Sequence, residues 1–220
     1  MSGFPILKFD FGRAQWRFML LWILLLGLIL PEFLDAGQER KPLLVILLFS
    51  VGRAEDPEKG VLCPICKGIR RPGEILPASQ NTLTDLLNTK METNGTFQII
   101  AQENVEIPLH SPSPIQVGKK LEADFIFVGY VFRFEERIGS SLGVERPASV
   151  SFDLHLFRLR DEKMVWMGKF DETQRPLSEN VLKIGSFIRR KGSWLRAAEL
   201  ASVGMDEMLR ELPGLKELEQ

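Results

Sequence analysis

The stretch from residue 123 to residue 174 constrains the fold most, because it contains three consecutive strand patterns. Residues 125–131 are apolar on both faces, which predicts a strand in the middle of a sheet. Residues 149–156 alternate between polar and apolar side chains, as in a strand with one face in the core. After a turn at 160–163, residues 164–170 are expected to return antiparallel. The stretch contains no catalytic motif, so we interpret it as a scaffold.

The remaining elements alternate between strand and helix. Hydrophobic periodicity predicts strands at 43–49 and 96–101 and helices at 78–92, 114–123, 178–189 and 194–212. The second of these helices has a start signal, in which Ser113 and Gln116 form a capping box around Pro114. This order predicts an α/β fold of two layers, with a mixed sheet of about five strands and helices mainly on one face.

The amino terminus has the pattern of a targeting or anchoring segment. Residues 1–17 hold three basic side chains against one acid, and residues 18–30 are an apolar run of 13 residues. An apolar stretch of about 7–15 residues behind a positive flank is typical of a signal peptide. It is shorter than the roughly 20 residues of a transmembrane helix. We therefore expect 1–36 to be a signal peptide or a retained signal anchor, and 37–220 to be a single exported domain.

Composition excludes one class of partner. The chain has 220 residues, of which 45% are hydrophobic, so it is long enough for a substantial core. Its 28 basic and 29 acidic side chains leave a net charge of −1, which gives no electrostatic reason to bind nucleic acid.

The segment Cys63-Pro64-Ile65-Cys66 is the only chemical motif, and it lies in a loop at 52–77. We favour a local disulfide that shapes this loop after export. A redox-active or free thiol pair is a second interpretation, because Cys-x-x-Cys spacing can lower a thiol pKa. A metal site is the third and weakest, since a structural zinc needs four ligands and the chain has no second cysteine pair.

The two histidines, His110 and His155, add little to this motif. His155 alternates with core residues on a predicted strand, which indicates an exposed or hydrogen-bonded side chain. It belongs to a polar row that we expect to face solvent, made of Ser149, Ser151, Asp153 and His155.

Enzyme signatures are missing from the sequence. It has no Gly-x-Ser-x-Gly motif, and Gly118-Lys119-Lys120 lacks the remainder of a phosphate-binding loop. We therefore predict no catalytic residue and no cofactor, and we expect a non-enzymatic protein.

Several segments resemble strand patterns of bacterial envelope proteins. ADFIFVGYVFRF (123–134), MVWMGKFDET (164–173) and KPLLVILLF (41–49) are similar to segments of the curli-secretion lipoproteins, the lipoprotein activators of penicillin-binding proteins and the amino-terminal domain of the Tol translocation protein. GVERPASVSFDLHLF (143–157) and FDETQRPLSEN (170–180) are more similar to an uncharacterised subgroup. The chain departs from the lipoproteins in having no cysteine just after its apolar run, and its Cys-Pro-Ile-Cys loop is not part of the pattern.

The resemblance implies a periplasmic domain for protein–protein contact. We expect it to bind or help assemble other envelope proteins, to touch the inner membrane if its anchor is retained, and to form a homo-oligomer as one option. Loops carry much of the functional surface of a domain, so Gly139, Gly143, Arg146 and Pro147 form the candidate contact loop. The alternative function is a thiol-redox or metal-binding envelope protein acting through Cys63 and Cys66.

Overall fold

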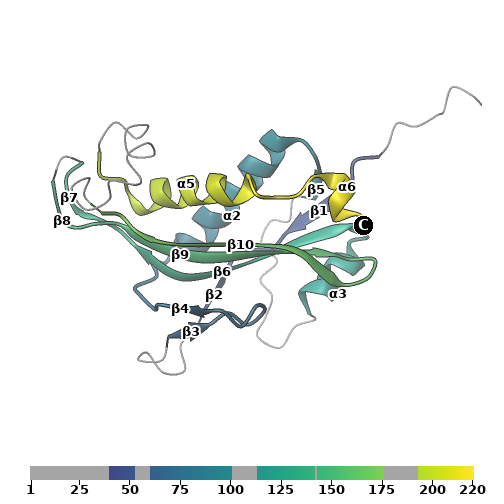
Figure 1. Cartoon of the computed structure of the whole chain (residues 1–220), viewed down its shortest axis with the longest axis horizontal. Helices are drawn as coiled ribbons and strands as arrows, with labels where there is room; N and C mark the ends of the chain where they lie inside the picture. The colour runs from purple at the N-terminus through teal and green to yellow at the C-terminus, as the bar shows by residue number, and fades with distance from the viewer. Residues whose placement is uncertain (1–39, 53–59, 101–112, 142, 176–192) are drawn as a thin grey trace, which may run out of the picture. The chain divides into compact units, whose positions relative to one another are not determined.

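A six-stranded mixed sheet organises the residues that this computed structural model describes, which are 40–52, 60–100, 113–141, 143–175 and 193–220 (Figure 1). Its strands are β1 (Leu43–Ile46), β2 (Ser50–Val51), β5 (Gln98–Ile100), β6 (Phe125–Glu135), β9 (Ser149–Arg158) and β10 (Lys163–Thr173). The order across the sheet is β10-β9-β6-β1-β5, and β2 pairs with β6 beyond the end of β1. The predicted α/β class with a mixed sheet is confirmed.

The strands predicted at 125–131, 149–156 and 164–170 form the long half of the sheet. β6 pairs parallel with β1 and antiparallel with β9, and β9 pairs antiparallel with β10. Strands β6 and β9 therefore lie inside the sheet, which agrees with the two-sided apolar pattern of β6.

Helices α2 (Ser79–Asn94) and α5 (Ala197–Leu209) cover one face of the sheet, which we call the helix face (Figure 1). The opposite face, the hairpin face, is covered by the short helix α3 (Pro114–Lys120) and by a hairpin of β3 (Val61–Leu62) and β4 (Ile69–Arg70). A second small hairpin, β7 (Ile138–Gly139) and β8 (Val144–Arg146), follows β6, and α6 (Leu215–Leu218) lies near the carboxyl terminus. The capping box predicted at Ser113 is present at the start of α3.

Three predictions fall outside the described residues. They are the amino-terminal segment 1–36 with its apolar run 18–30, the helix at 178–189, and His110. Within the described ranges, none of the helices has the length and the apolar character that crossing a membrane requires.

The prediction that the polar row of β9 faces solvent is wrong. Ser149, Ser151, Asp153 and His155 are all buried, with exposed fractions of 3% or less. Their alternation with core residues is real, but the β3–β4 hairpin and Arg133 lie over the face to which they point. On a strand that is buried on both faces, each polar group without a hydrogen-bond partner costs stability, so most such groups have one.

We predict that Gly204→Ala destabilises the protein although alanine favours helices. Gly204 lies in α5 directly over Phe170 of β10, and an added Cβ would come within 2.5 Å of the Phe170 ring. The helix-propensity gain of about 1 kcal/mol is opposed by an overpacking cost of about 1–3 kcal/mol. We expect a net loss of about 1 kcal/mol in urea unfolding, whereas the control Ser202→Ala on the same helix should lose nothing. A Gly204→Ala variant that gains stability would contradict the packing of α5 on β10.

Candidate functional site

The β3–β4 hairpin holds both cysteines against the sheet. Cys63 directly follows β3, and its amide N–H donates to the Gly68 carbonyl at 2.9 Å. The turn then closes through the Lys67 amide, which donates to the Cys63 carbonyl at 3.0 Å. Lys67 has a φ of 59°, in the left-handed region that tight turns use. Cys63 is fully buried and Cys66 is half-buried.

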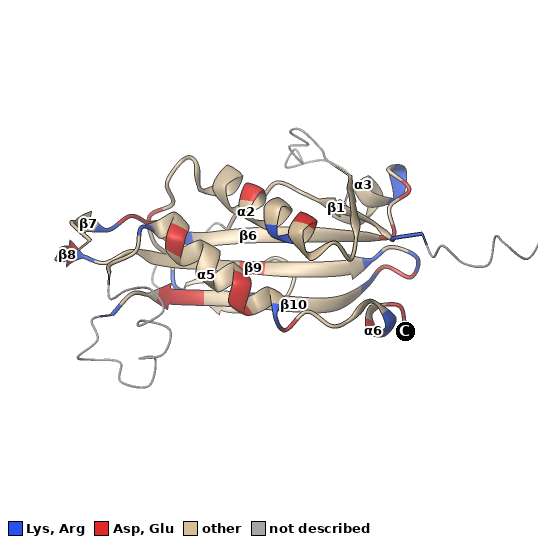
Figure 2. Ribbon diagram, turned by 90° about the horizontal axis from the view of Figure 1, so that it is seen from above, with Lys and Arg blue, Asp and Glu red and all other residues tan. Residues whose placement is uncertain are grey.

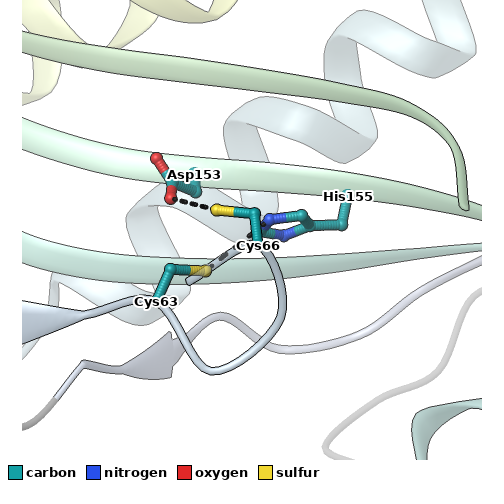
Figure 3. A group of neighbouring side chains, drawn as sticks. All are labelled: Cys63, Cys66, Asp153 and His155. Carbon is teal, nitrogen blue, oxygen red and sulfur yellow. Dashed lines mark hydrogen bonds between the residues drawn. The ribbon is translucent and has the colours of Figure 1, made fainter. Parts of the chain in front are cut away.

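Strand β9 supplies the other half of the site. Asp153 and His155 lie two residues apart on β9, so both side chains point to the hairpin face. His155 Nε2 lies 3.6 Å from Cys63 Sγ, and Asp153 Oδ2 lies 3.6 Å from Cys66 Sγ (Figure 3). One potential ligand atom from each of these four residues lies within 4.8 Å of the other three. We call this group the Cys-His-Asp cluster.

An ion pair anchors the carboxylate of the cluster. Arg70 Nε and Nη2 donate to Asp153 Oδ1 and Oδ2 at 2.9 and 2.8 Å. Both side chains are buried, and the guanidinium also lies over the Phe132 ring, with Cζ 5.9 Å from the ring centroid. The two-pronged geometry fixes the orientation of the Asp153 carboxylate.

Burial sets the protonation states in the cluster. Burial raises the pKa of the Cys63 thiol to about 11, and the nearby Asp153 charge acts in the same direction. Burial also lowers the pKa of His155, although Asp153 and the Val128 carbonyl oppose this shift. Without a cation, Cys63 is therefore a protonated thiol and His155 a neutral imidazole near pH 7.

The disulfide favoured by the sequence is not formed in the structure, where Cys63 and Cys66 are separate thiols. The sequence interpretation also missed Asp153 and His155 as neighbours of the cysteines. One signal for them exists in the sequence, because a carboxylate and an imidazole two residues apart on one face of a core strand need buried partners. Nothing in the sequence identifies the hairpin as that partner.

The candidate contact loop lies apart from the Cys-His-Asp cluster. Gly139 and Gly143 belong to the β7–β8 hairpin, where Gly139 has a φ of 113° and an added Cβ would lie 2.6 Å from the Gly143 carbonyl oxygen. Arg146 and Pro147 line a polar cavity of about 650 Å³. Its other lining residues include Arg71, Arg133, Ser149, Asp171, Glu172 and Arg175.

The buried guanidinium of Arg133 forms part of the cavity wall. Arg133 donates to Ser149 Oγ at 2.6 Å, to Asp171 Oδ1 at 2.5 Å and to the Arg71 carbonyl at 3.2 Å. Ser149 Oγ is thus hydrogen-bonded to Arg133 and also to Thr173 Oγ1 at 2.5 Å, whereas Ser151 Oγ has no hydrogen-bond partner among the described residues.

No protein-family model and no curated protein matches this sequence. Solved structures with a similar arrangement include the PelC dodecamer from Paraburkholderia phytofirmans, which is 11% identical over 82% of this chain and 92% of its own, with a TM-score of 0.46. The lipoprotein GNA1162 from Neisseria meningitidis is 8% identical over 69% of this chain and 98% of its own, with a TM-score of 0.39. The LpoB C-terminal domain from Salmonella enterica is 11% identical over 66% of this chain and 91% of its own, with a TM-score of 0.37.

At these identities and TM-scores, the three structures support no further conclusion about the chain. The sequence resemblance to envelope families therefore stays a prediction, and membership of a family is not established.

We predict that Arg70→Met is strongly destabilising and that Arg70→Met/Asp153→Leu is less so. The single change leaves the buried Asp153 carboxylate without its counter-charge, which costs about 3–5 kcal/mol for buried pairs, whereas removal of both partners costs much less. The exposed pair of Lys119 and Glu162 is the control, and Lys119→Met should cost at most about 1 kcal/mol. Urea unfolding measures all three variants. A double variant no more stable than Arg70→Met would show that the ion pair does not compensate the buried charge.

Proposed function

We propose that this chain is an exported, non-enzymatic domain that binds another protein of the bacterial envelope. One observation carries the non-enzymatic part. The Cys-His-Asp cluster is the only group of three or more His, Cys, Asp or Glu ligand atoms gathered closely in the described residues, and it lies under a hairpin. Cys63, Asp153 and His155 are at most 1% exposed, so a substrate has no access to them. The cluster therefore does not offer the accessible reactive groups that a catalytic site presents beside a cavity.

The thiol-redox function that the sequence left open loses support. A redox-active cysteine needs a lowered pKa and an accessible sulfur. Cys63 has the opposite properties, since it is buried and its pKa is raised to about 11.

The export part of the proposal is supported by the amino-terminal sequence pattern alone. A positive flank and the apolar run at 18–30 direct a chain into the secretory route, with the residues beyond about 37 on the outer side. If the segment is retained, the domain is tethered to the inner membrane and its partners are proteins within reach of that surface.

The polar cavity beside the β7–β8 hairpin is the best-supported contact surface. In Figure 2 the ribbon at the end of the sheet near β7 and β8 carries both basic and acidic residues. Arg71 and Arg175 on the cavity wall are exposed, and neither has an ion pair among the described residues. Arg146 is also exposed, and its ion pair among the described residues is a long contact of 3.7 Å with Glu74. Exposed guanidinium groups at a cavity, with at most a long ion pair among the described residues, are suited to carboxylates of a protein partner.

We predict that a photo-cross-linking amino acid placed at Arg146 captures an envelope protein in living cells. The full chain is expressed in a bacterium, and the same amino acid at the exposed Lys216 of α6 serves as control. Adding Arg71→Glu should reduce the yield about tenfold, because a reversed charge on the wall costs at least about 1.4 kcal/mol of binding. Capture of a second copy of this chain would indicate a homo-oligomer. If position 146 captures no more protein than position 216, this surface is not the contact site.

A further inference from the structure

We infer that Cys63, Cys66, Asp153 and His155 form a structural binding site for a divalent transition metal, and that Zn²⁺ fits it best. This inference is independent of the proposed envelope partner. Two thiolates, an imidazole and a carboxylate are ligand types that zinc accepts in four-coordinate sites.

The distances match the geometry of a tetrahedral zinc site. With a Zn–S bond of about 2.3 Å and Zn–N or Zn–O bonds of about 2.0–2.2 Å, a sulfur and a neighbouring N or O ligand lie about 3.5–3.7 Å apart. Cys63 Sγ lies 3.6 Å from His155 Nε2, and Cys66 Sγ lies 3.6 Å from Asp153 Oδ2. The remaining pairs of ligand atoms lie within 4.8 Å, so small side-chain shifts bring all four around one ion.

The imidazole is held in the orientation that a metal ligand needs. His155 Nδ1 lies 3.3 Å from the Val128 carbonyl on β6. The tautomer that donates from Nδ1 to this carbonyl leaves the Nε2 lone pair facing the two thiols. Metal-bound histidines generally donate their second nitrogen to a carbonyl or carboxylate in this way.

Arg70 balances the charge of the loaded site. Two thiolates neutralise a divalent cation, and the Arg70 guanidinium neutralises Asp153, which it holds with two hydrogen bonds. The buried group then carries no net formal charge. A monovalent ion would leave one uncompensated negative charge, and buried charges without a counter-charge are costly. The charge balance therefore favours a divalent metal.

The structure indicates a structural role and not a catalytic one for the metal. Four protein ligands occupy every position of a tetrahedral ion, which leaves none for water or substrate. The β3–β4 hairpin consists of two strands of two residues each, too short to be stable without further support. A bound ion would tie this hairpin to a strand about 90 residues later, as the sequence separation of Cys63 and His155 shows.

The first test is the metal content of the full chain, purified with a reducing agent and without chelator. We expect about one zinc per chain by inductively coupled plasma mass spectrometry. After removal of the metal, Co²⁺ should give intense visible bands of a tetrahedral ion and thiolate-to-cobalt charge-transfer bands. Native mass spectrometry of the same protein distinguishes the zinc-bound chain from a chain with a Cys63–Cys66 disulfide by mass. The two states exclude one another, because zinc binds thiolates and a disulfide has none.

Substitutions distinguish zinc coordination by all four residues from weak binding by the two cysteines alone. Cys66→Ser and His155→Gln should each weaken zinc binding by about 100-fold or more, as removal of a ligand exceeds the effect of outer-sphere changes. Ser151→Ala is the matched control, because Ser151 is buried on the same face of β9 and has no hydrogen-bond partner among the described residues. It should bind zinc like the unchanged chain.

If a variant does not fold, a measurement on the chain without substitutions still tests the inference. Chelation should then expose both thiols to an aromatic disulfide reagent and lower the melting temperature, and added Zn²⁺ should reverse both effects. The inference is overturned if the reduced chain binds no zinc or cobalt. It is equally overturned if the chain isolates as a stable Cys63–Cys66 disulfide that binds no zinc after reduction, or if a folded His155→Gln variant binds zinc unchanged.

Discussion

The structure of the hairpin face depends on one constraint, which is that the buried polar side chains of β9 need hydrogen-bond or charge partners. Strand β9 contributes Phe152, Leu154 and Leu156 to the core under α2 and α5, so its other side chains must point to the opposite face. That face is also covered, and a polar group without a partner there costs about 1–3 kcal/mol. Arg70 compensates the charge of Asp153, and Arg133 donates to Ser149, which lies two positions before Ser151. The hairpin therefore stabilises β9, because its residue Arg70 is the charge partner of the buried Asp153.

Much of the fold could be predicted from periodicity. The two-sided apolar run of β6 identified an internal strand, and the alternation of β9 identified which residues share a face. The capping box of α3 and the left-handed Gly95 at the end of α2 are local signals that need no tertiary information. Each of these features depends on residues only a few positions apart.

The candidate site could not be predicted in the same way, because its halves come from distant segments. Alternation shows that Asp153 and His155 lie on one face, but it does not show what covers that face. Solvent is the simplest partner for such a face, and the alternation of His155 with core residues therefore gives no reason to place it beside the Cys-Pro-Ile-Cys segment. Asp153 and His155, the two further ligands of the metal site that we propose, lie on the face of β9 that alternation predicts to be exposed. The wrong prediction for this face therefore also hides the proposed partners of the two cysteines.

The cluster and the cavity share one segment of backbone, which relates the chemistry of the site to the surface. Arg70 binds Asp153 in the cluster, while the carbonyl of the next residue, Arg71, accepts from Arg133 in the cavity wall. Gly73 then packs so closely on Arg133 that an added Cβ would lie 2.4 Å from its Cγ. An interaction that holds the hairpin against β9 therefore also helps to position Arg71 and Arg133 in the cavity wall. The metal that we propose for the cluster would have no access to substrate, and it would act on function in this way, through the shape of a surface that it does not touch.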